Sequence, residues 1–310
     1  MRSLTVDLDG PYHYADYGGD GPPMVLLHGI GGSHINWMLV APALAERFHV
    51  YALDEIGFGF TPVGRRDSKF LTQARYVDRF IAEVAGGPAL VMGHSMGGVI
   101  GMILAARYPT AVAGLVPIDP AACVIRSSAS GVPTWLLLTL AVYPDLGGRL
   151  AGAIVRSRGP EAVVRQALGA DFGPGSAVDP TLLAAHIDLE KRRAIMPVPY
   201  RGYVEGWASM RNTHAERPAF LKDVVARIEA PVLLVRGTLD PLIPQYWFER
   251  LAEARPDWAN ARLEGVGHDP QMEAPEVFLD AIKAWLDPAP MAEVSQLPGA
   301  AGGHSSLSRL

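Results

Sequence analysis

The sequence has only one cysteine, Cys123, among its 310 residues. A single thiol cannot form a disulfide within the chain, and it argues against a metal cluster held by thiolates. We interpret Cys123 as a small buried apolar residue rather than a reactive thiol. Histidine pairs or carboxylate clusters with the spacing of metal ligands are also lacking, and no glycine-rich loop ends in the Lys-Ser or Lys-Thr of a phosphate-binding loop. The sequence therefore predicts no metal and no cofactor.

Strong charge of one sign and long apolar runs are absent as well. The net charge is −5, so nothing in the composition favours nucleic acid or an anionic membrane as a partner. The longest apolar run, Val132–Pro144, is too short to span a bilayer, and residues 1–14 lack the apolar core of a signal peptide. Hydrophobic residues make up 49% and charged residues 19%, as in an ordinary globular enzyme. We expect a cytoplasmic protein that acts on a small molecule without membrane insertion.

Short apolar segments alternate with helical patterns along most of the chain. This alternation predicts an α/β fold in which helices cover both faces of a mainly parallel, doubly wound sheet. The predicted strands are Pro23–His28, His49–Asp54, Ala89–Gly93, Gly114–Asp119, Pro231–Gly237 and Ala261–Gly265. The predicted helices are His34–Arg47, Phe70–Val84, Met96–Tyr108, Gln245–Ala254 and Ala274–Leu286. Right-handed crossovers bring the carboxyl ends of parallel strands to one edge, where we expect the ligand to bind.

The alternation stops between residues 121 and 217. This stretch is rich in helical patterns and aromatic residues and contains no convincing buried strand. We interpret it as a helical cap inserted into a core formed by residues 1–120 and 218–287. Residues 288–310 are rich in Pro, Gly and Ser, which is typical of a disordered tail.

A serine stands between two glycines at the point where a predicted strand gives way to a helix. The segment "GHSMG" places Ser95 at that corner, with Gly93 and Gly97 two positions away on either side. A sharp turn of this kind exposes its corner residue at the edge of the sheet, and a Cβ at either glycine would collide with the turn. The pattern therefore predicts that Ser95 is a nucleophile.

A serine hydroxyl needs a base, and the base needs a carboxylate that fixes its tautomer. Two further strand ends supply these groups. Asp240 follows the strand Pro231–Gly237 in "RGTLDPLIP", and His268 follows the strand Ala261–Gly265 in "GVGHDPQMEAPE". The chain order Ser95, Asp240, His268 is that of one particular hydrolase architecture.

The oxyanion that forms during attack on a carbonyl needs hydrogen-bond donors. The backbone N–H of Met96, directly after the nucleophile at the start of a helix, is one expected donor. The glycine-rich turn "HGIGG" (residues 28–32) is expected to supply the other from Ile30. We interpret His28 and His94, which flank these loops, as residues that shape turns or form local hydrogen bonds.

The chain resembles the α/β-hydrolase fold superfamily of esterases and lipases over residues 11–120 and 218–287. The resemblance depends on five segments at family-like spacing: "HGIGG", "DEIGFGFT", "GHSMGG", "RGTLDPLIP" and "GHDPQMEAPE". It implies a mainly parallel sheet with a helical cap after the sixth strand. It also implies these roles: nucleophile Ser95, acid Asp240, base His268, and oxyanion donors Ile30 and Met96.

Some relatives carry the acid at the end of an earlier strand, which makes Asp119 the alternative acid in this chain. Two positions of the second segment, Glu55 and Thr61, differ from the residues common in the family, and neither belongs to the predicted triad.

These residues predict a carboxylesterase-like serine hydrolase that cleaves a hydrophobic carboxylic ester through an acyl-enzyme intermediate. One alternative is a C–C bond hydrolase of ring-cleavage diketones, although a Trp commonly follows the catalytic histidine closely in those relatives and does not follow His268. Another is a hydrolase-fold ligand-binding protein with little turnover. Dehalogenases and epoxide hydrolases use an aspartate nucleophile, and Ser95 argues against both.

Overall fold

The computed structural model describes residues 1–121, 143–196, 200–213 and 218–287 of the chain. Cys123 and the predicted tail, 288–310, lie outside the described residues. Among the described helices, none combines the length and the apolar character needed to cross a membrane.

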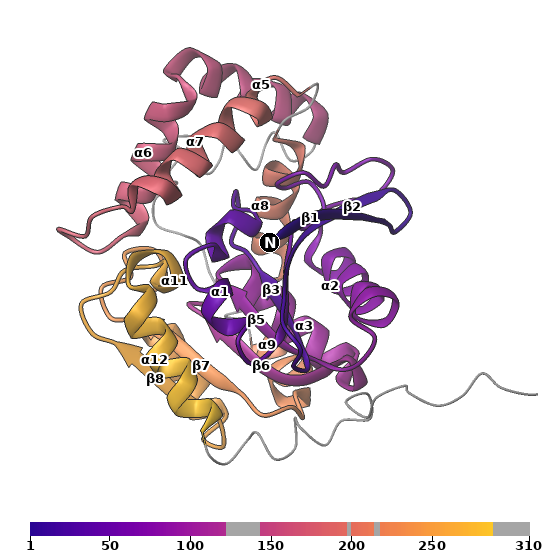
Figure 1. Ribbon diagram of the computed structural model, residues 1–310, viewed down its shortest axis with the longest axis vertical. Helices are drawn as coiled ribbons and strands as arrows, with labels where there is room; N and C mark the ends of the chain where they lie inside the picture. The colour runs from indigo at the N-terminus through magenta and orange to yellow at the C-terminus, as the bar shows by residue number, and fades with distance from the viewer. Residues whose placement is uncertain (122–142, 197–199, 214–217, 288–310) are drawn as a thin grey trace, which may run out of the picture.

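Eight strands form one sheet in the order β1-β2-β4-β3-β5-β6-β7-β8 (Figure 1). The strands are β1 (Arg2–Asp7), β2 (Pro11–Gly18), β3 (Pro23–Leu27), β4 (His49–Leu53), β5 (Ala89–His94), β6 (Val112–Ile118), β7 (Leu233–Gly237) and β8 (Ala259–Leu263). All pairs from β4 to β8 are parallel, whereas β2 is antiparallel to both β1 and β4. The predicted mainly parallel sheet and its six predicted strands are confirmed, with boundaries shifted by one or two residues.

The hairpin β1–β2 was not predicted. The alternation of polar and apolar residues in β1 reflects its position at the sheet edge, where side chains are exposed or half-buried. Asp9 and Gly10 turn the chain with φ of 55° and 126°, a region that favours glycine. The turn therefore reverses the chain in few residues and pairs β1 with β2.

The inner strands are buried on both faces because each carries apolar residues without interruption. In β3, Val25 and Leu27 pack into the cluster beneath α2 and α3, whereas Met24 and Leu26 pack against α1 and α12 on the other face. The bounds of these helices are α1 (Ala41–Leu44), α2 (Phe70–Phe80), α3 (Met96–Arg107) and α12 (Pro275–Leu286). Helices therefore cover both faces, as a doubly wound fold requires.

Four of the five predicted helices differ in detail from the structure. The predicted helix Met96–Tyr108 ends one residue earlier, at Arg107. The predicted helix His34–Arg47 is a 3-10 turn, His34–Trp37, followed by the short α1, whose second residue, Pro42, has no N–H to donate. The predicted helix Phe70–Val84 ends at Phe80 and continues as a wider π turn. The last predicted helix begins at Pro275 and is preceded by a separate short helix, α11 (Pro270–Glu273). Helix α10 (Gln245–Ala254) has its predicted bounds.

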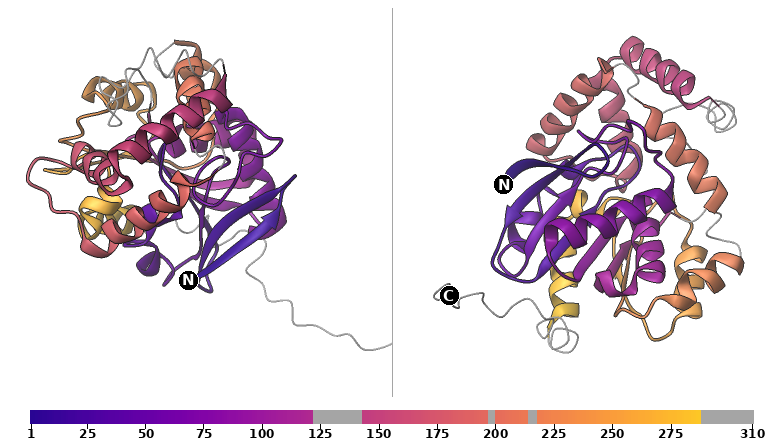
Figure 2. Two further views of the ribbon diagram at one scale, coloured as in Figure 1. Left: turned by 90° about the horizontal axis from the view of Figure 1, so that it is seen from above. Right: turned by 90° about the vertical axis from the view of Figure 1, so that its right-hand side faces the viewer.

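Among the residues that the structure describes, five α-helices follow β6 and precede β7, which confirms a helical insertion after the sixth strand. They are α5 (Pro144–Arg158), α6 (Pro160–Asp171), α7 (Pro180–Ala194) and α8 (Arg201–Thr213), and α9 (Pro218–Asp223) leads back toward the sheet. Figures 1 and 2 show this helical layer above the carboxyl edge of the strands. We call it the cap. Its predicted boundaries, 121 and 217, stay a prediction.

A small apolar cluster joins the cap to the core. Leu168 of α6 and Leu182 of α7 are buried together with Met272 of α11, and Ile35 packs against the same cluster. The cap is thus held over the end of the sheet by apolar contacts on the side of α11.

Candidate active site

Ser95 stands at the corner between β5 and α3, where the sequence predicts a nucleophile. Its φ of 51° and ψ of −111° lie in a region that residues with a side chain rarely adopt. The strained backbone is held by a hydrogen bond from the Ser95 N–H to the Ile118 carbonyl, 2.8 Å, and by the Ala121 N–H, which donates to the Ser95 carbonyl, 3.0 Å. Ser95 is 2% exposed and lines a cavity beneath the cap.

The two glycines that flank Ser95 are needed for close backbone packing. A Cβ on Gly93 would lie 2.2 Å from the Gly97 carbonyl oxygen, and a Cβ on Gly97 would lie 2.4 Å from the Leu27 carbonyl oxygen. Either distance is far below van der Waals contact, so a side chain at either position would force the turn open. The steric reason given for this motif is confirmed.

His268 and Asp240 meet in the structure although 27 residues separate them in the chain. The His268 Nδ1 atom lies 2.8 Å from Asp240 Oδ2. The other carboxylate oxygen of Asp240, Oδ1, accepts hydrogen bonds from the backbone N–H groups of Leu242 and Ile243, with N···O distances of 2.7 and 2.9 Å. These two hydrogen bonds fix the carboxylate in place. His268 is buried and lines the same cavity as Ser95.

Asp119, the alternative acid, lies close to this pair and has different partners. Its Oδ2 accepts the Gly237 N–H at 2.9 Å, and its Oδ1 lies 3.6 Å from Nη1 of Arg236. Polar atoms of Asp119, Asp240 and His268 all lie within 4.8 Å of one another. The imidazole Nδ1, however, is hydrogen-bonded to Asp240.

The electrostatics of the three groups favour a single negative charge beside the imidazole. Burial and the charge of Asp240 raise the pKa of Asp119 well above its usual range, which favours the neutral form of Asp119. Burial opposes the charged form of Asp240, but the charge and hydrogen bond of His268 outweigh it and lower the pKa of Asp240. Burial would lower the pKa of His268, but Asp240 outweighs it and raises that pKa. The pair therefore stabilises the imidazolium form.

The loop 28–32 approaches Ser95 closely. A Cβ on Gly29 would lie 2.9 Å from His94 Nδ1 and 3.3 Å from the Ser95 Cβ, so only glycine fits there. Among the described backbone carbonyls, none accepts a hydrogen bond from the N–H of Ile30 or of Met96. Both predicted oxyanion donors are therefore left without a backbone acceptor, and Ile30 lines the cavity.

His28 forms a local hydrogen bond, as predicted, whereas His94 bonds a residue far away in the chain. The Nδ1 atom of His28 donates to the neighbouring Gly29 carbonyl, 2.7 Å, and Nε2 of His94 donates to the His268 carbonyl, 2.7 Å. Burial and the positive charge of His268 lower the pKa of His94 well below its usual range. His94 is thus a neutral ring that supports the backbone of the predicted base.

The cavity lies between the loops at the end of the sheet and the helices of the cap, and it has a volume of about 210 Å³. Its apolar lining includes Ile154, Val164, Leu168, Leu189 and Trp207 from the cap. The cap thus contributes most of the apolar wall, as expected from its composition.

Two carboxyl groups that line this cavity were missed by sequence analysis. Asp269 directly follows His268, is buried, and lies 3.3 Å from His94 Nε2. Asp171 ends α6 in the cap, accepts the His268 N–H at its backbone carbonyl, 2.7 Å, and has a buried Oδ1 without a partner among the described residues. The position of Asp269 next to the predicted base was a usable signal, whereas nothing in the sequence pointed to Asp171.

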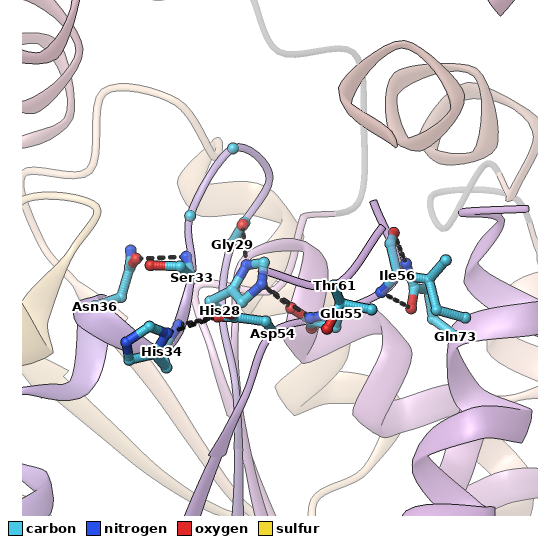
Figure 3. Close-up of polar contacts among 12 residues, drawn as sticks. His28, Gly29, Ser33, His34, Asn36, Asp54, Glu55, Ile56, Thr61 and Gln73 are labelled. Carbon is cyan, nitrogen blue, oxygen red and sulfur yellow. Dashed lines mark hydrogen bonds and ion pairs between the residues drawn. The ribbon is translucent and has the colours of Figure 1, made fainter. Parts of the chain in front are cut away.

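His13, His34 and Asp54 form the other compact group of potential metal ligands among the described residues. Asp54 accepts hydrogen bonds from Nδ1 of His34 at 2.9 Å and from the His34 backbone N–H at 2.7 Å (Figure 3). It also accepts hydrogen bonds from Nδ1 of His13 at 2.7 Å and from the Phe60 backbone N–H at 2.8 Å. A metal would have to displace the protons of both imidazoles and compete for a carboxylate that is already saturated. We interpret this group as a hydrogen-bonded support for the loops.

Comparison with known proteins agrees with this geometry. The model of the alpha/beta hydrolase fold family matches residues 22–275. The chain is 26% identical to the pimeloyl-[acyl-carrier protein] methyl ester esterase of Aeromonas hydrophila, over 86% of this chain and 96% of the relative. A bacterial membrane phospholipase A of known crystal structure is 27% identical, with a TM-score of 0.69 over 92% of this chain and 86% of that one.

A more distant structure shares the fold alone. The serine hydrolase CarC, which is involved in carbazole degradation, is 22% identical and superposes with a TM-score of 0.71 over 92% of this chain and 98% of that one. The family match covers far more than half of the chain, and it includes the strand ends that carry Ser95, Asp240 and His268. The chain therefore belongs to the alpha/beta hydrolase fold family.

Proposed function

We propose that this protein is a serine hydrolase that cleaves a hydrophobic carboxylic ester through an acyl-enzyme intermediate. The observation that carries the proposal is one cavity that contains both a strained corner serine, Ser95, and an imidazole, His268, that is hydrogen-bonded to a carboxylate, Asp240. This combination of groups is the one that activates a hydroxyl for attack on a carbonyl.

In the acylation step, the Ser95 hydroxyl attacks the acyl carbon and its proton passes to Nε2 of His268. The Asp240 carboxylate stabilises the imidazolium and keeps Nδ1 as the donor. The negative charge that develops on the carbonyl oxygen is stabilised by the N–H groups of Ile30 and Met96, which have no acceptor among the described backbone carbonyls. The imidazolium then protonates the departing alcohol.

In the second step, the same imidazole removes a proton from water, which attacks the acyl-enzyme and releases the acid. The apolar wall formed by α5 to α8 favours an uncharged acyl or alcohol group with a substantial apolar surface. A cavity roofed by the cap also limits the water around the oxyanion, which strengthens its hydrogen bonds.

Two relatives support ester cleavage as the reaction class. The Aeromonas relative is named as a methyl ester esterase, and the crystallised relative is named as a phospholipase A, which also cleaves an ester. Both are about a quarter identical to this chain. They support the reaction class, whereas the substrate of this protein follows from its own cavity.

The proposal is tested by replacing the nucleophile and measuring hydrolysis of p-nitrophenyl esters with acyl chains of two to twelve carbons. We expect Ser95→Ala to lower kcat by at least ~10⁴-fold, because the remaining groups act only through the nucleophile. A fluorophosphonate probe should label the wild type at Ser95 and leave the variant unlabelled. Ser157→Ala is a matched control, because Ser157 is an exposed serine of the cap that donates to the Ile154 carbonyl.

Different outcomes separate the alternatives. Undiminished ester hydrolysis by Ser95→Ala would eliminate the proposed mechanism. Labelling of Ser95 without sustained turnover would point to a ligand-binding protein on this fold. Turnover of a vinylogous diketone without activity on simple esters would point to C–C bond cleavage.

A further inference from the structure

The carboxylate of Glu273 accepts three hydrogen bonds that come from two distant parts of the chain. Its Oε2 atom accepts the backbone N–H of Gly267, the residue directly before His268, at 2.7 Å. Its Oε1 atom accepts the backbone N–H of Gly173 at 3.0 Å and the hydroxyl of Ser176 at 2.6 Å. We call residues 171–176, which connect α6 to α7, the cap turn, and residues 265–268 the base loop. One carboxylate therefore ties the cap turn to the base loop.

The cap turn presents both of its donors to the same carboxylate oxygen. The Ser176 N–H donates to the Gly173 carbonyl at 3.1 Å, and this hydrogen bond closes the turn. Closure brings the N–H of the first residue and the hydroxyl of the last to Glu273 Oε1. The contact is thus built from a local turn of the cap and one side chain of the core.

The cap turn and the base loop also touch through their backbones. A Cβ on Gly267 would lie 2.7 Å from the Asp171 carbonyl oxygen and closer still to the Gly173 nitrogen. Both distances are far below van der Waals contact, so a side chain at position 267 would push the two segments apart. This close approach allows the His268 N–H to donate to the Asp171 carbonyl at 2.7 Å.

The backbone of His268 is therefore held by both parts of the molecule. Its carbonyl accepts Nε2 of His94 from the core at 2.7 Å, whereas its N–H is bonded to the cap turn. The second bond exists only while the cap turn stays against the base loop. Because Glu273 bonds both segments, it holds the Asp171 carbonyl within reach of the His268 N–H.

We propose that Glu273 is a positioning residue for the base, which clamps the cap turn onto the base loop and so fixes the backbone from which His268 reaches Ser95. This inference rests on the proposed function. Asp240 fixes Nδ1 of the imidazole, but Nε2 can take the proton of Ser95 only if the main chain of His268 is correctly placed. A displacement of about 1 Å can lower the rate by about 10²-fold, so this placement matters to the reaction.

Apolar contacts near Glu273 do not replace this clamp. Phe172 of the cap turn and Met272 of α11 are buried in the apolar cluster that joins the cap to the core. Such contacts have no directional preference, so they hold the cap turn near α11 without aligning its N–H groups. Hydrogen bonds to a carboxylate are directional and are stronger than those to a neutral acceptor.

The test compares Glu273→Leu with Glu273→Gln. Leucine accepts none of the three hydrogen bonds, whereas the Gln oxygen can accept the Gly267 N–H and the Gln amide can donate to the Ser176 hydroxyl. We expect Glu273→Leu to lower kcat for p-nitrophenyl esters by about 10-fold or more, and Glu273→Gln by only about threefold. A displaced base slows the chemical step for every ester. The loss should therefore be the same for short and long acyl chains, with KM within about a factor of three.

Proton NMR reports the position of His268 without any substrate. The proton between His268 Nδ1 and Asp240 Oδ2 should give a downfield imidazole resonance, because it lies in a short hydrogen bond to a carboxylate. We expect this resonance to shift or broaden in Glu273→Leu and to persist in Glu273→Gln.

Asp179→Ala is the matched control for the stability of the cap. Asp179 is another carboxylate of the cap that accepts two backbone N–H groups, those of Thr181 and Leu182, at 2.8 and 2.9 Å. Both belong to the first turn of α7, which Asp179 caps. Loss of this cap should lower the Tm of the protein and leave kcat and the imidazole resonance unchanged.

Ser176→Ala carries the test if Glu273→Leu does not fold. The Ser176 side chain is exposed, and its hydroxyl supplies one of the two bonds from the cap turn to Glu273. We expect this variant to fold and to lower kcat by about two- to threefold with an unchanged KM. A wild-type kcat in Ser176→Ala would then overturn the inference.

Two further results would overturn it. One is a folded Glu273→Leu protein with the kcat and the imidazole resonance of the wild type. The other is an equal loss of kcat in Glu273→Leu and Asp179→Ala, which would mean that Glu273 serves the stability of the cap alone. A wild type that neither hydrolyses esters nor reacts with a fluorophosphonate would instead remove the proposed function. The resonance of His268 would still report whether Glu273 positions the imidazole, so the two failures are distinguishable.

Discussion

At the scale of single residues, the two carboxyls near His268 differ in what they contact. Asp240 is hydrogen-bonded to the imidazole, whereas Asp119 is hydrogen-bonded to the Gly237 N–H. We expect Asp240→Asn to lower kcat by about 10³–10⁴-fold, because an amide can stabilise the wrong tautomer of the base. Asp119→Asn keeps an oxygen for the Gly237 N–H and should lower kcat by less than about tenfold. Steady-state kinetics of both variants on one ester measures the two losses of kcat. A larger loss in Asp119→Asn than in Asp240→Asn would make Asp119 the acid.

The same pair predicts a pH dependence. His268 must be neutral to accept the proton of Ser95, and Asp240 raises its pKa. The acid limb of kcat/KM should therefore lie above the value of about 6.5 that is typical of a free imidazole. Residual activity of Asp240→Asn should show an acid limb at lower pH, because the negative charge is gone. An unchanged limb would mean that another group controls the profile.

At the scale of elements, the inner strands and their loops were predictable because each leaves a local signal. An apolar run buried on both faces, followed by a glycine-rich turn, marks both the strand and the edge at which it ends. The hairpin β1–β2 was missed because edge strands are short and half-exposed, and its alternation was weighed only against a signal peptide. The helix predicted over His34–Arg47 was wrong because one proline, Pro42, interrupts an otherwise helical pattern.

Helix α7 of the cap contacts the loop that carries Ile30, and this contact had no signal in the sequence. Nη1 of Arg193 donates to the Gly31 carbonyl, 2.9 Å, and Nη2 to the Gly32 carbonyl, 3.3 Å. Nη1 also pairs with Glu190, which accepts the hydroxyl of Tyr200. A guanidinium is the side chain that can bridge several oxygens at once. The cap therefore holds the loop from above while His28 holds it from below.

The contacts of Arg193 with the two carbonyls and with Glu190 predict different effects on stability and activity for two substitutions of Arg193. Arg193→Met leaves Glu190 buried without its cation, and we expect a loss of about 3 kcal/mol in the free energy of unfolding and a clear loss of kcat/KM. Arg193→Lys keeps a charge for Glu190 but cannot bridge both carbonyls, so it should recover stability more than activity. Urea unfolding and ester kinetics measure the two effects.

Arg192→Met is the matched control for Arg193→Met, because Arg192 lies on the same helix and its side chain is 61% exposed. Equal recovery of stability and activity by Arg193→Lys would mean that charge alone matters at this position.

At the scale of the whole molecule, the site forms where two parts of the chain meet. The core supplies the proposed reacting groups from strand ends, and their convergence follows from the parallel sheet. The cap supplies the apolar wall and the carboxyl of Asp171, and its contribution depends on how the helices dock, which no local pattern encodes. Sequence analysis therefore reached Ser95, Asp240 and His268 as a set and did not reach Asp171 or Arg193.

The buried carboxyl of Asp171, which lines the cavity between the cap and the core, should lower the free energy of unfolding at neutral pH. Burial raises the pKa of Asp171 to about 6, above its ordinary value of 3.8, so the folded state binds a proton more tightly than the unfolded chain. Stability from this group is therefore present below pH 4 and is lost as the pH rises through 6. We expect Asp171→Asn to be more stable than the wild type at pH 8, by on the order of 2 kcal/mol, and to lose that advantage near pH 4.

Urea unfolding at several pH values measures this difference between Asp171→Asn and the wild type. The control is Asp188→Asn, because Asp188 is an exposed carboxyl of the cap that pairs with Arg192. Its substitution should change the free energy of unfolding by less than about 0.5 kcal/mol at any pH, since exposed ion pairs contribute little. A destabilised Asp171→Asn at pH 8 would mean that the carboxylate is stabilised by its surroundings, and the cavity would then have to be treated as a site that favours negative charge.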